Sequence, residues 1–244
     1  MKRLLLLPLA LAALAGCGGA SSDLKTTEDH LSRIRAATLE LRVLVTPRVT
    51  GDSQPFGFKL VGPFDLRSGG PLPRLHVDYT QIANGRTATA IVDSDGRKAT
   101  VRTGGRTVTL SAAAARGLRV VGGTFQKGSL DLTAWVRHPH VSSGPNGAER
   151  IDGDLDVGRA LSCFAGLTGS TPPPLTKDEQ KRLQEAVKSA RIEVVTGRKD
   201  KLLRRVHFTA DLGFEAPPDL RSALGNLVGA KLELELKLGN PQTA

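Results

Sequence analysis

The clearest pattern in the chain is alternation of apolar and polar residues, which is typical of β-strands with one buried face. The sharpest case is Leu232–Leu238, where leucines alternate with Glu233, Glu235 and Lys237. Strand-like runs recur at residues 56–60, 75–79, 87–92, 99–102, 107–110, 151–155, 192–196 and 203–214. The turn dipeptides Asn84-Gly85 and Gly104-Gly105 separate neighbouring runs. The pattern therefore predicts roughly nine strands joined as antiparallel hairpins.

Helical spacing of apolar residues predicts helices beside these strands. The expected helices span residues 24–41, 111–116, 130–136, 157–167, 177–190 and 220–228. Asp156 is placed to cap the fourth of them, and Thr176 with Glu179 has the spacing of a capping box at the start of the fifth. Because strands with one apolar face must bury it, we expect an α+β fold. Its strongly curved antiparallel sheet, a half-barrel, would have helices covering the concave face.

Residues of the same parity on neighbouring strands should point into one interior. The candidates for this interior are Phe56, Phe58, Leu75, Val77, Val206, Phe208, Leu232, Leu234 and Leu236. Their polar neighbours Lys59, Glu233, Glu235 and Lys237 would face water. We expect part of the apolar face to remain unfilled by side chains and to accept acyl chains. Trp135 either anchors its short helix to the core, which we favour, or lines the cavity.

The N-terminus has the pattern of a secretory signal peptide. Lys2 and Arg3 precede an apolar run over residues 4–14, which is shorter than the roughly 20 residues that span a bilayer. The ending Leu14-Ala15-Gly16-Cys17 resembles the lipobox of bacterial lipoproteins, in which the cysteine becomes the lipidated N-terminus. The alternative is an ordinary cleaved signal with a chance cysteine.

The lipobox implies an order of segments along the chain. Residues 1–16 would be the signal peptide, residues 17–23 a tether lipidated at Cys17, and residues 24–244 a single domain. The protein would then be anchored to the cell membrane on its extracytoplasmic face. Cys163 would be the one remaining thiol, so no intramolecular disulfide is possible, and we expect it to be buried and inert.

Composition limits the classes of molecule that the protein is expected to bind. The formal charge of +10 falls to +8 when Lys2 and Arg3 leave with the signal, because 10 − 2 = 8. A basic surface outside the cell favours anionic headgroups and polymers. The positive charge is scattered, however, mostly as arginine, and we favour the interpretation that it forms a solvated face. The chain has one Trp, one Tyr and seven Phe, too few rings for base stacking, which argues against nucleic acid.

No pattern in the chain points to catalysis or to a cofactor. The sequence holds no Gly-x-Ser-x-Gly elbow and no Gly-rich phosphate loop. His138 and His140 do not have the spacing of a standard zinc site. Asp152, Asp154 and Asp156 alternate as in a calcium loop, but the glycine and glutamate that such a loop needs are missing. We therefore expect no enzyme activity, no metal and no cofactor.

The lipobox, the sheet-and-helix pattern, and the segments Leu130–Val136 and Ile151–Val157 together resemble the LppX/LprG-type lipoproteins of actinobacteria. That family shares a fold like the lipoprotein carriers LolA and LolB, and the Gly104-Gly105 hairpin fits it too. The resemblance implies an open half-barrel that encloses a cavity for acyl chains and has no catalytic residues.

The function implied is non-covalent binding of a lipid or lipidated glycan, which the protein carries or presents in the envelope. A membrane transporter is a candidate partner, and we expect a monomer. The alternative is an envelope sensor or accessory lipoprotein that uses the same fold to bind protein. Such a protein would fill its interior with its own side chains and expose an apolar patch instead.

Overall fold

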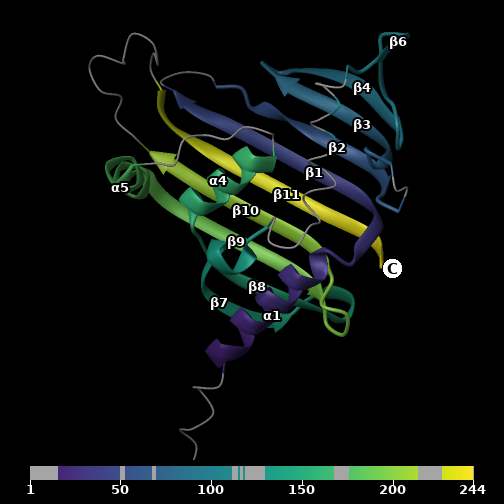
Figure 1. Ribbon diagram of the computed structural model, residues 1–244. Helices are drawn as coiled ribbons and strands as arrows, with labels where there is room; N and C mark the ends of the chain where they lie inside the picture. Colours follow the sequence, from purple (N-terminus) through teal and green to yellow (C-terminus); the bar gives the residue numbers. More distant parts are fainter. Residues whose placement is uncertain are drawn as a thin grey trace, which may run out of the picture.

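One antiparallel sheet of eleven strands dominates the computed structural model, which describes residues 16–49, 53–67, 70–111, 115, 118, 130–167, 176–213 and 227–243 (Figure 1). The strand order is β6-β5-β4-β3-β2-β1-β11-β10-β9-β8-β7. The strands are β1 (Ile34–Val49), β2 (Phe56–Asp65), β3 (Arg74–Ala83), β4 (Arg86–Asp95), β5 (Ala99–Thr103), β6 (Arg106–Thr109), β7 (Val136–Ser143), β8 (Ala148–Leu155), β9 (Val187–Gly197), β10 (Leu203–Gly213) and β11 (Leu227–Thr243). The first and last strands are thus neighbours in the middle, while β6 and β7 are free edges, so the sheet does not close.

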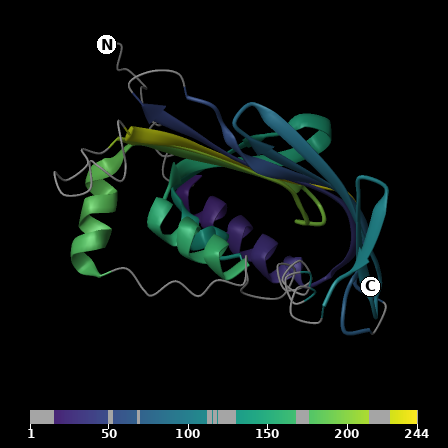
Figure 2. The same cartoon turned by 90° about the horizontal axis from the view of Figure 1, so that it is seen from above.

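The helices lie on the concave side of the sheet, as predicted (Figure 2). They are α1 (Gly16–Leu31), α3 (Leu132–Trp135), α4 (Val157–Leu167) and α5 (Lys177–Ala186), with a 3₁₀ turn at Pro145–Gly147. The sheet curves over α1 and α4, whereas α5 stands at one end of it. The fold is therefore the predicted half-barrel, an open curved sheet with helices against its concave face.

The hydrophobic core lies between these helices and the sheet. Leu24 and Leu31 of α1, Trp135 of α3 and Ala160 of α4 are at most 2% exposed and pack in one cluster with the concave face. α1 contacts β7, β10 and α3. The helices thus cover mainly the half of the sheet that ends at β7.

The N-terminal helix differs from the predicted helix 24–41. α1 ends at Leu31, and residues 34–49 form β1. Leu39, Leu41 and Val43 also fit strand alternation, and β1 is paired along its length with β2 on one side and β11 on the other. This pairing outweighs local helical spacing. Residues 17–23, expected to be a tether, belong to α1, where Ala20 is buried.

The predicted helix 130–136 is reduced to one turn, α3. Asp131 caps it by accepting a hydrogen bond from the amide of Ala134. The chain then enters β7, which carries His138 and His140. Pro139 is tolerated there because β7 is an edge strand, whose outer amides need no partner in the sheet.

Two predicted helix caps are confirmed. In the capping box of α5, Glu179 accepts a hydrogen bond from the amide of Thr176 at 2.8 Å. Asp156 accepts one from the amide of Arg159 in the first turn of α4. α5 ends at Ala186, four residues earlier than predicted, where β9 begins.

Several predictions fall outside the described residues. They are the signal peptide, most of the helices expected at 111–116 and 220–228, and the side chains of Cys17 and Cys163. Within the described part of the chain, no helix is long and apolar enough to cross a membrane.

Candidate functional site

The concave side of the central strands forms one continuous apolar face. Val43 of β1 is paired with Phe58 of β2 and with Leu234 of β11, which is paired in turn with Phe208 of β10. Directly paired residues of antiparallel strands point to the same side of the sheet. Apolar side chains therefore line up in rows across four strands.

All nine strand residues predicted to share an interior lie on this face. The registers of β1, β2, β3, β10 and β11 bring together Phe56, Phe58, Leu75, Val77, Val206, Phe208, Leu232, Leu234 and Leu236. Their polar neighbours Lys59, Glu233, Glu235 and Lys237 lie on the opposite, convex face. Trp135 is 1% exposed and part of the core, in keeping with an anchoring role. That these residues contact a ligand stays a prediction.

Burial of the apolar face decreases along the strands. Near the C-terminal end of α1, Leu39, Leu238 and Phe64 are between 3% and 5% exposed. In the middle, Val43 and Val45 of β1 and Leu232 of β11 are half-buried. At the far end, Phe56 is 47% exposed, and Val228, which a bulge leaves out of the pairing of β11 with β1, is 50% exposed. The face is thus packed by protein at one end and open at the other.

This gradient divides the predicted residues into two groups. Most of them are at most 7% exposed and are already packed by protein, namely Leu75, Val77, Trp135, Val206, Phe208, Leu234 and Leu236. The ones that keep accessible surface are Phe56, Phe58 and Leu232.

Four further residues of the open part were missed by sequence reasoning. They are Leu41 of β1, which had been assigned to a helix, Val43 and Val45 of β1, which had been assigned to no element, and Leu60 of β2. All four are half-buried. The signal that could have found the β1 residues is the alternation from Leu39 to Val45, which matches that of Leu232–Leu238.

The convex face is polar and internally charge-paired. Glu40 lies between Lys59 and Lys237, with nitrogen–oxygen distances of 3.1 and 3.8 Å. Glu235 lies between Lys237 at 3.0 Å and Arg205 at 2.7 Å. Burial alone would raise the pKa of Glu235, but the hydrogen bond from Lys237 and the nearby Arg205 outweigh it and lower the pKa. The convex face carries few apolar side chains, such as Leu44 and Val61, among these charges, so the concave side is the candidate site.

Polar contacts hold α1 in place on the concave side. Lys201, in the turn before β10, binds Asp23 of α1 at 2.8 Å and also Glu149 of β8. Glu28 of α1 is buried and accepts a hydrogen bond from the amide of Thr133 at 2.5 Å. These contacts fix the helix that closes the packed end of the apolar face.

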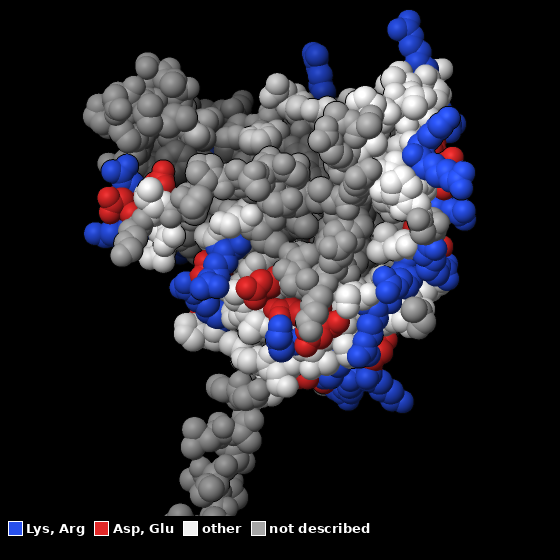
Figure 3. Space-filling view, viewed as in Figure 1, with Lys and Arg blue, Asp and Glu red and all other residues white. Residues whose placement is uncertain are grey.

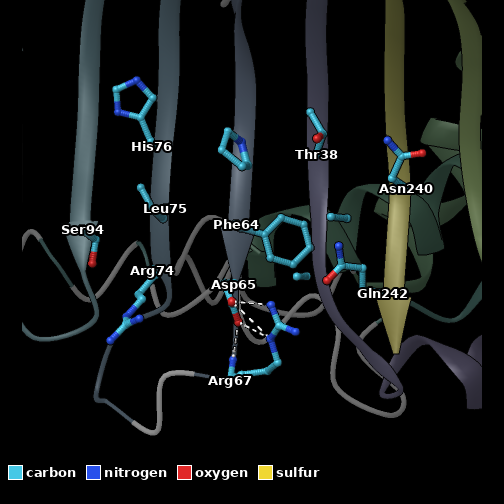
Figure 4. A pocket seen from close by; sticks show the side chains of 13 residues that line it. Thr38, Phe64, Asp65, Arg67, Arg74, Leu75, His76, Ser94, Asn240 and Gln242 are labelled. Atoms are coloured by element: carbon cyan, nitrogen blue, oxygen red, sulfur yellow. Dashed lines mark hydrogen bonds and ion pairs between the residues drawn. The ribbon is translucent and has the colours of Figure 1, made fainter. Parts of the chain in front are cut away.

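A hollow of about 500 Å³ lies at the packed end of the apolar face, where β1 and β3 begin and β2 ends (Figure 4). Phe64 and Leu75 lie in it, and its rim carries Asp65, Arg67 and Arg74. Arg67 and Asp65 bind each other through two pairs of atoms, at 2.7 and 3.0 Å. Apolar and polar side chains share the lining of this hollow.

The acidic residues weighed as metal ligands are engaged in ion pairs. Asp154 binds Arg191 at 2.7 Å and His138 at 3.0 Å. The hydrogen bond with His138 is the main cause that holds the pKa of Asp154 below its usual value. Among the described residues there is no group of three or more His, Cys, Asp or Glu side chains that could hold a metal ion.

Comparison with known proteins gives a match in structure but not in sequence. No protein-family model matches the chain, and no curated protein matches it. LprF from Mycobacterium bovis superposes with a TM-score of 0.50 at 11% identity, over 93% of this chain and 96% of LprF. The lipoprotein LppX from Mycobacterium tuberculosis gives 0.44 at 11%, over 93% and 98% of the two chains. A LolA superfamily protein from Nitrosomonas europaea gives 0.23 at 9%, over 91% and 94%.

The match to LprF extends over nearly the full length of both chains. At 11% identity it concerns the fold alone. The expected resemblance to LppX/LprG-type lipoproteins is therefore confirmed at the level of fold, and this chain shares its curved half-barrel architecture with LprF.

Proposed function

We propose that this chain is an envelope lipoprotein that binds a lipid or lipidated glycan without covalent chemistry and carries or presents it. The observation that carries the proposal is the apolar concave face, which is packed at one end and open at the other. Each methylene group of an acyl chain that is removed from water stabilises binding by about 0.8 kcal/mol. A face that is several strands wide and half-buried offers such chains a place to bind.

The fold shared with LprF supports this proposal. The lipobox at residues 14–17 supports anchoring through Cys17 on the extracytoplasmic side of the membrane. With that anchor the protein would take up and deliver its lipid close to a bilayer, where a membrane transporter is a candidate partner.

Binding of a fluorescent fatty-acyl probe tests the proposal. Val206, a predicted cavity residue, is only 1% exposed, so a tryptophan there would overpack the core. Val45 is the better position because it is half-buried on the open part of the face, and Thr46 is its matched control on the opposite face of the same strand. In a Cys17→Ser chain, Val45→Trp should weaken probe binding roughly tenfold, while Thr46→Trp should leave it unchanged.

The melting temperature of both variants shows whether each is folded. A folded, unmodified chain that binds no acyl probe would contradict the proposal and favour the alternative of a protein-binding lipoprotein. Equal loss of probe binding in Val45→Trp and Thr46→Trp would also contradict it, because the site would then not be on the concave face.

A further inference from the structure

The open end of the apolar face exposes side chains that a protein in water normally covers. Phe56 begins β2 and is paired with Val45, which is paired on its other side with Leu232. Phe56 is 47% exposed, and Val228, near the start of β11, is 50% exposed. These are two of the four large hydrophobic residues that are exposed in the described part of the chain. An apolar row therefore runs from the candidate site out to the surface.

The strand ends around this opening are basic. They comprise residues 46–49, 53–58, 82–88, 187–190, 210–213 and 227–231. Their cations are Arg48, Arg86, Lys188 and Lys231, and Asp211 is the one acid within these ranges. Lys and Arg side chains also lie at several other places on the surface of the molecule (Figure 3).

The one acid of these strand ends is already neutralised within the protein. Arg48 binds Asp211 at 2.6 Å and donates a hydrogen bond to the carbonyl oxygen of Leu212 at 2.6 Å. By contrast, Arg86, Lys188 and Lys231 are exposed and form no ion pair with any residue that the structure describes. Within the described part of the chain, these three cations have no acidic partner.

We propose that this end of the molecule, the docking end, rests on an anionic lipid bilayer, so that an acyl chain passes directly between the bilayer and the apolar face. The docking end is defined by Phe56, Val228, Arg86, Lys188 and Lys231. This inference rests on the proposed function and adds to it the place of lipid entry and the kind of surface that supplies the lipid.

The docking end combines cations with exposed apolar side chains, and an anionic bilayer binds both. Cations are attracted to anionic headgroups, and apolar side chains enter the boundary between headgroups and acyl chains. The register of β2 with β3 places the hairpin that carries Arg86 beside Phe56, because Gly57 is paired with Ile82. Lys188 packs against Gly213, which is paired with Gly229 next to Val228. Arg86 and Lys188 therefore flank this opening, whereas Lys231, which is paired with Thr46 and Asp211, lies at the same strand ends on the convex face.

Vesicle co-sedimentation tests the docking end separately from lipid binding. The Cys17→Ser chain removes the proposed anchor and is mixed with vesicles of phosphatidylcholine alone, or with equal parts of phosphatidylglycerol. We expect binding to the anionic vesicles, weaker binding to neutral ones, and loss of binding as salt screens the charges. The double variant Lys188→Ala/Lys231→Ala should weaken anionic binding tenfold or more, and Phe56→Ser should weaken it as well.

Matched controls are available elsewhere on the surface. Arg97→Ala/Lys98→Ala removes two exposed cations from the turn between β4 and β5, at the opposite end of the strands. Val108→Ser removes an apolar residue of β6 that is 59% exposed. Both controls should bind anionic vesicles like the unmodified chain.

The proposal is overturned if the docking-end variants bind anionic vesicles as well as the unmodified chain, or if the controls lose as much binding. Acyl-probe binding from solution keeps this result distinct from the proposed function. A probe that still binds, with vesicle binding indifferent to the docking-end variants, refutes the docking end alone. Absence of probe binding in the unmodified chain refutes the proposed function itself.

Discussion

Single glycines allow the close strand contacts on which the apolar face depends. A Cβ atom on Gly57 would lie 1.9 Å from the carbonyl oxygen of Val43, and one on Gly62 would lie 2.0 Å from that of His76. Both contacts are with backbone, which cannot move without breaking the pairing of β2 with its neighbours. Gly62 also lies between Leu39 and Val77 on the concave face. These positions therefore require glycine for the sheet to keep its register.

Gly62→Ala should destabilise the protein by about 1–3 kcal/mol, because the new methyl group overpacks the contact between β2 and β3. Gly239→Ala on β11 is the matched control, since its Cβ atom would meet Thr38 at an ordinary 3.5 Å. Urea unfolding measures both free energies of unfolding. Equal stability of Gly62→Ala and the unmodified chain would show that the approach of β2 to β3 is looser than described.

Residue-level reasoning predicted which side chains share a face but not which of them remain accessible. Alternation alone places Phe208 and Phe58 on the same side, and they are. Phe208 is packed by protein, whereas Phe58 keeps accessible surface. The difference depends on where the helices cross the sheet, and no local pattern contains that information.

Among the elements, α1 controls how much of the apolar face is covered. Its apolar side packs in the core, and Lys201 binds it through Asp23 while also binding Glu149. Burial lowers the pKa of Lys201, but its hydrogen bonds to the two carboxylates outweigh this and raise the pKa above the ordinary value of 10.5. The folded protein therefore holds this proton more tightly than the unfolded chain does.

Lys201→Met should lower the free energy of unfolding by about 1–3 kcal/mol, because it leaves two carboxylates without their cation. Since the pKa is raised on folding, the stabilisation is fully present below about pH 10 and is lost as the pH rises through the raised pKa. The difference between variant and unmodified chain should therefore be constant near neutral pH and shrink in alkali. In the Lys201→Met variant, amide hydrogen exchange in α1 should also be faster than in the unmodified chain.

Lys199 lies in the same turn and is exposed. Lys199→Met is therefore the control, and it should change neither the free energy of unfolding nor the amide hydrogen exchange of α1. A Lys201→Met protein with unchanged stability and unchanged exchange in α1 would mean that apolar packing alone holds this helix.

Elements with strong local signals were predicted well, and those decided by long-range pairing were not. The α5 capping box and the Asn84-Gly85 hairpin each lie within a few residues of sequence, and both are present. Residues 34–41 and Val136 were assigned to helices but belong to strands. β1 is paired with β11 at the other end of the chain, and Val136 is paired with Leu155 at the open end of the β7–β8 hairpin, beyond the reach of a local helical pattern. A single-sequence pattern cannot weigh such pairing against helical spacing.

At the scale of the whole molecule, the two faces of one sheet have different roles. The convex face carries cross-strand ion pairs that face water, such as Lys59 with Glu40 and Arg205 with Glu235. The concave face is apolar from the covered end to Phe56. The fold class followed from the sequence because so many one-sided strands require a cover. The pairing of β1 with β11 and the position of the open end of the apolar face depend on the path of the whole chain.

Photo-crosslinking with a diazirine-bearing fatty acid tests the central claim, that acyl chains bind on the open part of the concave face. After irradiation of the Cys17→Ser chain, the modified residues are located by peptide mass spectrometry. The structure predicts labels on Leu41, Val43 and Val45 of β1, on Phe58 and Leu60 of β2, and on Leu232 of β11. Labels confined to the convex face, or spread evenly over both faces, would contradict the account.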